Sequence, residues 1–190
     1  MSRPRPYTSA VTVPLPTDDE LRAALGDGYD PDRALNVVKM FAGTGDFMPA
    51  LLGMVRAIFA ADDIDAQHRE TIILRAASLL NVPYEWQANE QMAHNAGLTA
   101  DQIDRLASDG PVEGAGVEFD LLAAATDEML TSATLTDATL QRLMDVFGAQ
   151  TTRRYIVTIS WFSLLSLFLN ATRVPLETTD KIGSRTNPLE

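Results

Sequence analysis

Apolar residues recur at helical spacing along most of the chain, and short polar stretches with glycine or proline separate these segments. Such periodicity predicts amphipathic helices, because residues three and four positions apart share one helix face. The predicted helices cover residues 17–26 or 17–28, 30–42, Met48–Ala61, Ala66–Leu80, 83–95, 99–106, Val117–Leu130, Ala138–Phe147 and Thr151–Thr172. No run shows convincing strand alternation, so the pattern predicts an all-α domain.

Several helix boundaries carry recognisable start and stop signals. Two capping boxes, Thr17 to Glu20 and Thr99 to Gln102, predict helix starts, since the threonine and the Glu or Gln side chains each accept a backbone N–H. Asp30-Pro31 is a third start signal. Gly97 is a candidate left-handed residue at a helix end, and Gly148 is predicted to separate the last two helices.

The two helices joined by Asn81-Val82-Pro83 form the most informative stretch. Pro83 suits the first turn of a helix and ends the one before it. The first helix of the pair, Ala66–Leu80, is apolar on nearly every side from Thr71 onward. This pattern predicts a buried central helix.

The two ends of the chain differ from the helical region. Residues 1–16 contain four prolines and no helical periodicity. They predict an extended arm, which could lie on a neighbouring subunit, with a disordered tail as the alternative. Residues 17–177 are expected to form one domain, and residues 178–190 a polar C-terminal tail.

Composition narrows the classes of partner. The net charge of −11 and the pI of about 4.5 disfavour nucleic acids and anionic membranes. The chain has no cysteine, which excludes disulfides, thiolate metal sites and cysteine nucleophiles. The N-terminus shows no signal peptide, and the apolar run Tyr155–Leu169 is shorter than the roughly 20 residues of a membrane span. We therefore expect a cytoplasmic protein whose last helix is buried.

Two glutamates near the helix junction are the best candidates for catalysis. Glu70 shares a helix face with apolar residues, which would desolvate its carboxyl group and raise its pKa. The alternative is a structural carboxylate, favoured by the helix dipole or paired with Arg69. Glu85 lies in the first turn of the next helix, with Asn89 one turn later on the same face. Those two side chains could address one ligand, although Glu85 could equally be a solvated helix-start residue.

The other polar and aromatic candidates are weaker. His94 falls on the face of its helix opposite to Glu85, and His68 points away from Glu70, so both are expected at a surface or interface. Tyr84 and Trp86 are candidate substrate contacts, with core packing as the alternative. No histidine pair or repeated Glu-x-x-His supports a metal site, and no glycine-rich phosphate loop is present. We expect neither a metal nor a cofactor.

Several of these residues together resemble a known family. They are Arg69-Glu70, Ile73-Leu74-Arg75, Ala77, Asn81, Tyr84-Glu85-Trp86 and Ala96-Gly97-Leu98-Thr99. This combination resembles the carboxymuconolactone decarboxylase-like family, which shares its all-helical fold with alkylhydroperoxidase D. The similarity is strong over about residues 66–105 and looser from about 35 to 177. It implies assembly into a dimer, trimer or hexamer.

The resemblance also shows what this chain lacks. In the peroxidase branch of the family, a glutamate precedes a Cys-x-x-Cys pair and a histidine; here only Glu70 matches, because Val82, Glu85 and Asn89 occupy the other positions. The cysteine-free branch has Tyr-Glu-Trp followed by a histidine, and Asn89 again replaces that histidine. Asparagine can hydrogen-bond but does not exchange protons near neutral pH.

Three functional hypotheses follow. The first is a cofactor-independent lyase or isomerase acting on a small carboxylated or lactone metabolite, with Glu70 and Glu85 as acid and base and Asn89 orienting the substrate. Arg75, Arg153 or Arg154 would bind a substrate carboxylate. The second is a non-catalytic binding or assembly module. The third, a peroxidase, is disfavoured by the absence of cysteine.

Overall fold

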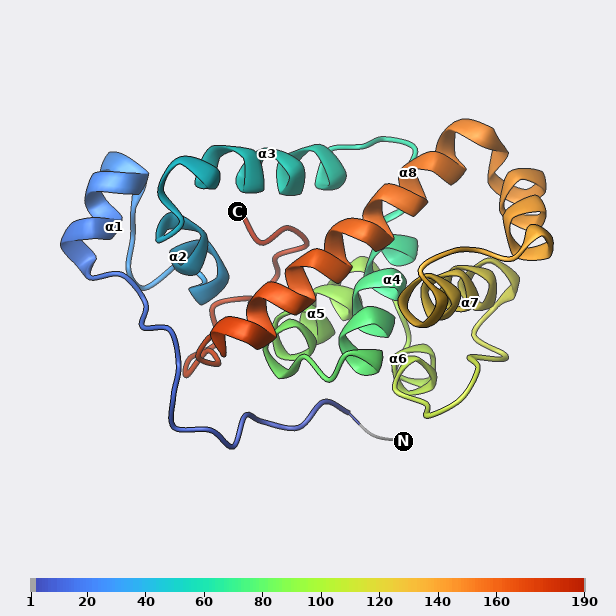
Figure 1. Cartoon of the computed structure of the whole chain (residues 1–190), viewed down its shortest axis with the longest axis horizontal. Helices are drawn as coiled ribbons and strands as arrows, with labels where there is room; N and C mark the ends of the chain where they lie inside the picture. The colour runs from blue at the N-terminus through green and yellow to red at the C-terminus, as the bar shows by residue number, and fades with distance from the viewer. Residues whose placement is uncertain (1–2, 190) are drawn as a thin grey trace.

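The structure, a computed structural model, describes residues 3–189, and no strand occurs among them. Its helices are α1 (Asp18–Leu25), α2 (Asn36–Ala42), α3 (Met48–Phe59), α4 (Ala66–Leu79), α5 (Pro83–Ala96), α6 (Ala100–Leu106), α7 (Val117–Ser132) and α8 (Asp137–Thr172), with short 3-10 turns at Gly26–Gly28 and Gly45–Phe47. The predicted all-α class is confirmed. Figure 1 shows α8 crossing the front of the molecule, with α4 and α5 behind it.

Helix α4 is the centre of the fold, as its all-round apolar pattern predicted. Every residue from His68 to Ala77 is buried. The helix packs against α5, α7 and α8, so it has no face left for solvent. Three of its buried residues, Arg69, Glu70 and Arg75, are charged types that are seldom fully buried without partners. Their partners therefore decide what the centre of the molecule does.

The predicted helix signals are confirmed except at α2. Both capping boxes form, and Gly97 ends α5 in the left-handed conformation at φ 105°. Gly148, at φ 75° and ψ 162°, interrupts α8, which is the sharp bend visible in Figure 1.

The prediction that a helix begins at Asp30 is wrong. Asp30 closes a turn instead, because its carboxylate accepts the Asp32 N–H at 2.9 Å and its carbonyl accepts the Ala34 N–H at 2.8 Å. Helix α2 begins at Asn36, whose N–H donates to the Glu177 carboxylate at 2.6 Å.

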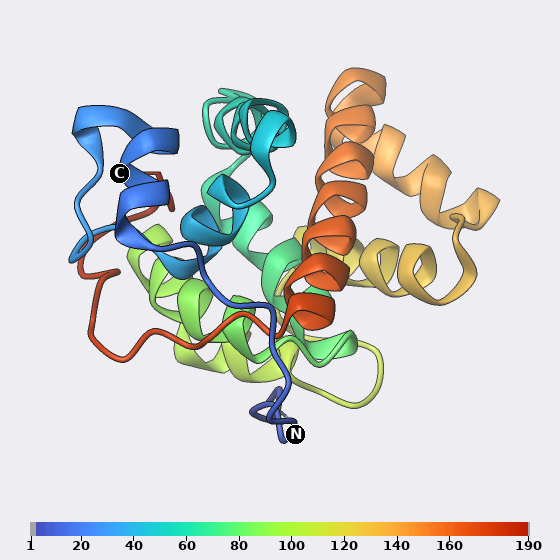
Figure 2. The ribbon, with the colours of Figure 1, turned by 60° about the vertical axis from the view of Figure 1, so that its left-hand side comes forward.

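Both terminal segments run along the outside of the helices (Figure 2). In the N-terminal segment the Val13 N–H donates to the Thr172 carbonyl at 3.0 Å, and the Tyr7 hydroxyl donates to Asn170 at 3.0 Å. In the C-terminal segment, Asn95 donates to the carbonyls of Gly183 and Arg185 at 2.9 and 2.8 Å. Each segment thus lies on its own chain in this structure.

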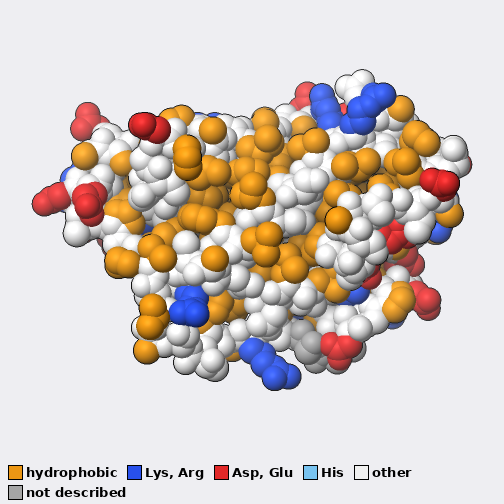
Figure 3. Space-filling model, viewed as in Figure 1, with side chains coloured by type: hydrophobic (Ala, Val, Ile, Leu, Met, Phe, Trp, Pro, Cys, Tyr) orange, Lys and Arg blue, Asp and Glu red, His pale blue; other side chains and the backbone are white. Residues whose placement is uncertain are grey.

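Helix α8 has one buried and one exposed apolar face. Its buried face includes Ile159, Phe162 and Leu169. By length and hydropathy the helix could cross a membrane, but 44% of the apolar window lies inside the fold, and a core helix has the same composition. In Figure 3, hydrophobic side chains form a band over α3 and α8 on this side of the molecule.

Candidate active site

The turn between α4 and α5 sets the relative position of the two candidate glutamates. Asn81 adopts the left-handed conformation at φ 51°, and the Val82 N–H donates back to the Ala77 carbonyl at 2.8 Å. This closure ends α4, and Pro83 starts α5 directly afterwards. The two helices then run side by side, so that residues of α4 and α5 meet inside the core.

Glu70 and Glu85 are both enclosed, with exposed fractions of 0% and 2%. Burial raises the pKa of Glu70 to about 7, with neighbouring Arg69 opposing the rise. It also raises the pKa of Glu85 to about 8; the Ser166 hydroxyl opposes that rise and the negative charge of Glu70 adds to it. Near neutral pH the pair can therefore hold one proton and one negative charge, which supplies an acid and a base together.

Each carboxyl group has one satisfied and one free oxygen. Glu70 Oε1 lies 3.4 Å from Arg69 Nε, and Glu85 Oε2 accepts the Ser166 hydroxyl at 2.8 Å. Within residues 3–189, Glu70 Oε2 and Glu85 Oε1 have no hydrogen-bond partner. Buried polar atoms are nearly always paired in folded proteins, so two unpaired oxygens in one cluster indicate a site that can accept a ligand or a proton.

A small cavity of about 30 Å³ opens beside Glu85. This volume holds a water molecule and no larger ligand. Its wall consists mainly of apolar side chains from α2, α3, α5 and α8 and from the C-terminal segment. Glu85 and Asn89 contribute to the wall, whereas Glu70 does not. Glu85 is thus the carboxyl group that faces the cavity, with Glu70 acting on it from behind.

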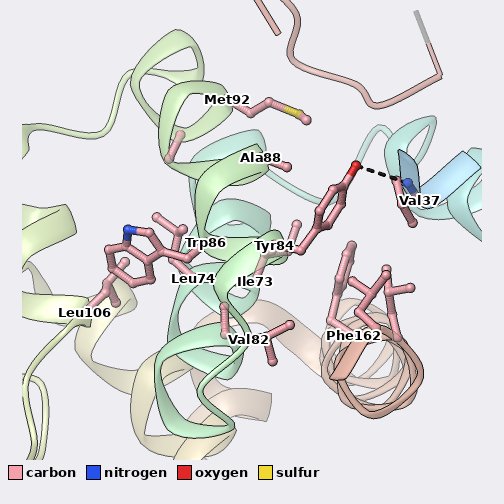
Figure 4. Packing of buried hydrophobic residues seen from close by; sticks show 14 of the residues in the cluster. Val37, Ile73, Leu74, Val82, Tyr84, Trp86, Ala88, Met92, Leu106 and Phe162 are labelled. Atoms are coloured by element: carbon pink, nitrogen blue, oxygen red, sulfur yellow. Dashed lines mark hydrogen bonds between the residues drawn. The ribbon is translucent and has the colours of Figure 1, made fainter. Parts of the chain in front are cut away.

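The predicted substrate contacts are divided between the two sides of α5. Tyr84 points toward Val37 and Phe162, and Trp86 points the opposite way toward Leu106 (Figure 4). The Tyr84 ring lines the cavity, but its hydroxyl is engaged elsewhere, accepting the Val37 N–H at 3.0 Å and donating to Glu177 at 2.6 Å.

Trp86 and Asn89, the other two predicted contacts, lie in different surroundings. Trp86 does not line the cavity and has the Arg3 guanidinium 5.8 Å from its ring. Asn89 lines the cavity, and its amide donates to the Glu85 carbonyl at 2.8 Å.

The arginines predicted to bind a substrate carboxylate are engaged elsewhere. Arg75 forms a two-pronged ion pair with Asp127, at 2.6 and 2.8 Å. Arg154 pairs with Asp63, and both Arg153 and Arg154 line a groove between α3 and α8 that does not contain Glu85. Arg69 is the cation beside the glutamate pair. It also lies 4.0 Å from the centre of the Phe59 ring and donates to the Thr186 carbonyl at 3.3 Å.

The histidines have the positions that their helices dictate, with one correction. His94 is exposed, as predicted. His68 is not at a surface: it is buried, with Nδ1 2.8 Å from the Tyr155 hydroxyl and Nε2 3.2 Å from Glu118. Aromatic residues of α7 and α8 enclose its ring, and these contacts come from elements that a single helical pattern does not relate. Among residues 3–189 no group of three or more metal-ligating side chains occurs.

Ser166 is a site residue that the sequence pattern did not single out. It is fully buried and is a polar residue on the inward face of α8, between Phe162 and Leu169. A polar residue on such a face needs a partner, and this was the available signal. Without the fold, nothing connects it to Glu85, which lies 81 residues away in sequence.

Residues 45–127 match the sequence model of the Carboxymuconolactone decarboxylase family. The chain belongs to this family. Comparisons with curated proteins and with solved structures gave no significant match. The all-helical fold is the one expected of the carboxymuconolactone decarboxylase family, so both the predicted family and the predicted fold are confirmed.

The family match includes Glu70, Glu85 and Asn89 and leaves out α8 and the C-terminal segment. Ser166 and Leu189, which contact or enclose the site, therefore belong to the part of the chain outside the matched region. The match relates this chain to the carboxymuconolactone decarboxylase family without selecting a reaction.

Proposed function

We propose that this protein is a lyase or isomerase that uses its own carboxyl groups for acid–base chemistry on a small metabolite, either a lactone or a carboxylated compound. The observation that carries the proposal is the buried pair of Glu70 and Glu85, each with one free oxygen, with Glu85 at a cavity wall. Membership of the carboxymuconolactone decarboxylase family agrees with decarboxylase-like chemistry.

In the proposed mechanism Glu85 exchanges protons with the substrate. As the neutral acid it donates a hydrogen bond to a substrate carbonyl oxygen, which stabilises the enolate formed when a neighbouring carbon loses a proton or carbon dioxide. The same carboxyl group then returns a proton to carbon. A proton returned to a different carbon gives isomerisation, and one that replaces carbon dioxide gives decarboxylation.

Glu70 and Ser166 act on the substrate through Glu85. The charge of Glu70 raises the pKa of Glu85, which keeps Glu85 protonated near neutral pH. Ser166 fixes one oxygen of Glu85 at 2.8 Å and leaves the other free. Asn89, one turn after Glu85 on the same helix face, would orient the substrate.

The direct test is to replace Glu85 by Gln and to screen lactones and their carboxylated relatives for turnover. The substitution keeps the shape of the side chain and removes the transferable proton, so turnover should fall by roughly 10²- to 10⁴-fold. Glu70→Gln should shift the pH profile of the reaction, because its charge no longer affects Glu85. Glu90→Gln, on the outer side of the same helix, is the matched control, and unchanged turnover in Glu85→Gln would contradict the proposal.

A second candidate function is a non-catalytic binding or assembly module of the same fold. Two observations favour it: the cavity in this structure holds only a water molecule, and Glu70 has an arginine beside it. Under this alternative, Glu85→Gln would leave every measured property of the site unchanged except stability at high pH.

We also propose that the protein forms a homo-oligomer through the outer face of α8. Val157, Leu164 and Leu167 are 47%, 50% and 63% exposed and lie on one face, since their spacing corresponds to whole helical turns. Contiguous exposed apolar surface of this kind is typical of interfaces. Leu164→Glu should convert the assembly to a 20.7 kDa monomer in light scattering, and a wild-type protein that is already monomeric would contradict the proposal.

A further inference from the structure

The wall of the cavity beside Glu85 is almost entirely apolar. Six of its residues supply most of the large side chains: Phe41, Phe59, Met92, Phe162, Leu165 and Leu189. They come from α2, α3, α5 and α8 and from the C-terminal segment, so the apolar surface surrounds the cavity. A ligand there exchanges water for hydrocarbon contacts over most of its surface, which favours an apolar body.

Few polar atoms remain available to a ligand in this cavity. The Tyr84 hydroxyl is engaged by Val37 and Glu177. Asn89 uses one amide hydrogen on the Glu85 carbonyl, and its other hydrogen and its oxygen are free to bind. Glu85 contributes Oε1, which has no partner among the described residues. The cavity can therefore satisfy one or two polar atoms of a ligand.

No lysine or arginine among residues 3–189 lines the cavity. The nearby cation, Arg69, already contacts Glu70, the Phe59 ring and the Thr186 carbonyl. A ligand carboxylate would lie beside Glu85, enclosed by hydrocarbon and without a counter-charge. Burial of an unpaired ion is among the most unfavourable events in a protein interior.

We propose that this cavity binds an uncharged, largely apolar carbonyl compound, such as an alkyl lactone or ketone, whose carbonyl oxygen pairs with Glu85 and Asn89. The inference rests on the proposed function because it concerns the same site, and it selects the uncharged arm of that proposal. The alkyl part of the ligand packs against the phenylalanine side chains of the wall.

Access to the cavity requires Pro188 and Leu189 to move. Both residues form part of the wall, and Leu189 packs half-buried against the core. The present volume of about 30 Å³ leaves no room for a lactone, so the ligand takes the space that the Leu189 side chain now fills. An aliphatic side chain in this position is itself consistent with an apolar occupant.

The test compares γ-alkyl lactones of increasing chain length with the ring-opened hydroxycarboxylates of the same carbon skeleton. Binding is measured by calorimetry at neutral pH, without reference to turnover. The lactones should bind at least about tenfold more tightly than the matched carboxylates, since the two differ chiefly in charge. Affinity should rise about fourfold per added methylene while the chain still fits, as expected for full burial of each group.

Two variants locate the binding at this cavity. Ala88→Leu adds volume to the wall and should weaken lactone binding, whereas Leu189→Gly empties the space and should strengthen it. Val13→Gly, in the other terminal segment and outside this cavity, is the control and should change nothing. Because Leu189→Gly alters a half-buried terminal position, it keeps the test informative if Ala88→Leu does not fold.

The outcomes separate this proposal from the proposed function. Tighter binding of the carboxylates, no lactone binding at any chain length, or lactone binding that neither variant alters would overturn the uncharged ligand class. If lactones bind as expected and none is converted, the ligand class stands and the catalytic proposal fails. If a carboxylate is bound and converted in a Glu85-dependent reaction, the catalytic proposal stands and the ligand class is overturned.

Discussion

Helix α4 carries two buried charged residues with opposite surroundings, Arg75 and Glu70. Arg75 directs its donors to the Asp127 carboxylate and to the carbonyls of Leu106, Ser108 and Gly110, at 2.6–3.1 Å. Glu70 has a single contact, 3.4 Å long, to Arg69. Its partner Glu85 likewise has one oxygen bonded and one free. One buried ion is thus fully paired, and the other belongs to a pair that is half satisfied.

The comparison separates a structural ion from a candidate catalytic one. A buried guanidinium with every N–H paired holds neighbouring elements together, and here it joins α4 to α7 and to the loop after α6. Half-satisfied carboxyl groups contribute little to holding the fold and are costly when charged. Their raised pKa values make them suited to proton transfer near neutral pH.

Replacing Arg75 by Met should give the largest effect on stability. The substitution leaves the Asp127 carboxylate and three backbone carbonyls without their donor, and breaking a buried pair in this way typically costs about 3–5 kcal/mol. Urea unfolding followed by circular dichroism measures the loss. Asp127 is partly exposed, so Asp127→Asn should cost less. A loss below about 1 kcal/mol for Arg75→Met would show that the network is not structural.

The glutamate pair should make stability depend on pH in a defined direction. The pKa values of about 7 and about 8 lie above the ordinary value of 4.5, so the folded protein holds more protons than the unfolded chain between these limits. The free energy of unfolding should therefore be greatest below about pH 4.5, as far as this pair is concerned, and fall as the pH rises toward 8.

Glu85→Gln should remove most of that decline. The variant should resemble the wild type at low pH and exceed it by roughly 2–4 kcal/mol above pH 8, at about 1.4 kcal/mol per pKa unit. Urea unfolding across a pH series measures the difference, with Glu90→Gln as the control. Parallel curves for Glu85→Gln and the wild type would mean that Glu85 titrates in its ordinary range.

Tyr84→Phe should have the smallest effect. The hydroxyl connects the Val37 N–H to Glu177 and does not face the cavity, so its removal should cost about 1 kcal/mol, the usual net value of one hydrogen bond. Turnover and lactone affinity should stay close to the wild type. A large loss of activity with unchanged stability would instead assign the hydroxyl to the site.

What the sequence could predict was decided by the range of the interactions involved. The helices, the burial of α4 and the capping boxes at Thr17 and Thr99 follow from neighbours a few residues apart, and they were predicted correctly. The start of α2 was not, because Asp30-Pro31 also suits a turn and the carboxylate that accepts the Asn36 N–H is 141 residues away.

The candidate site shows the same division. Glu70, Glu85 and Asn89 could be selected from helix position and residue type. The pairing of Glu85 with Ser166 and of Arg75 with Asp127 spans 81 and 52 residues, which helical periodicity does not relate. For this reason Arg75 was assigned to the substrate from sequence, although in the structure its donors are already engaged.

The central claim is that Glu70 and Glu85 share protons near neutral pH. Carbon-13 NMR of protein labelled at the glutamate carboxyl carbons measures this directly. The account predicts two resonances that titrate at about pH 7 to 8, one of which disappears in Glu85→Gln while the other titrates at lower pH because its charged neighbour is gone. If every glutamate titrates near 4.5, the pair is ionised like ordinary carboxylates and the account is contradicted.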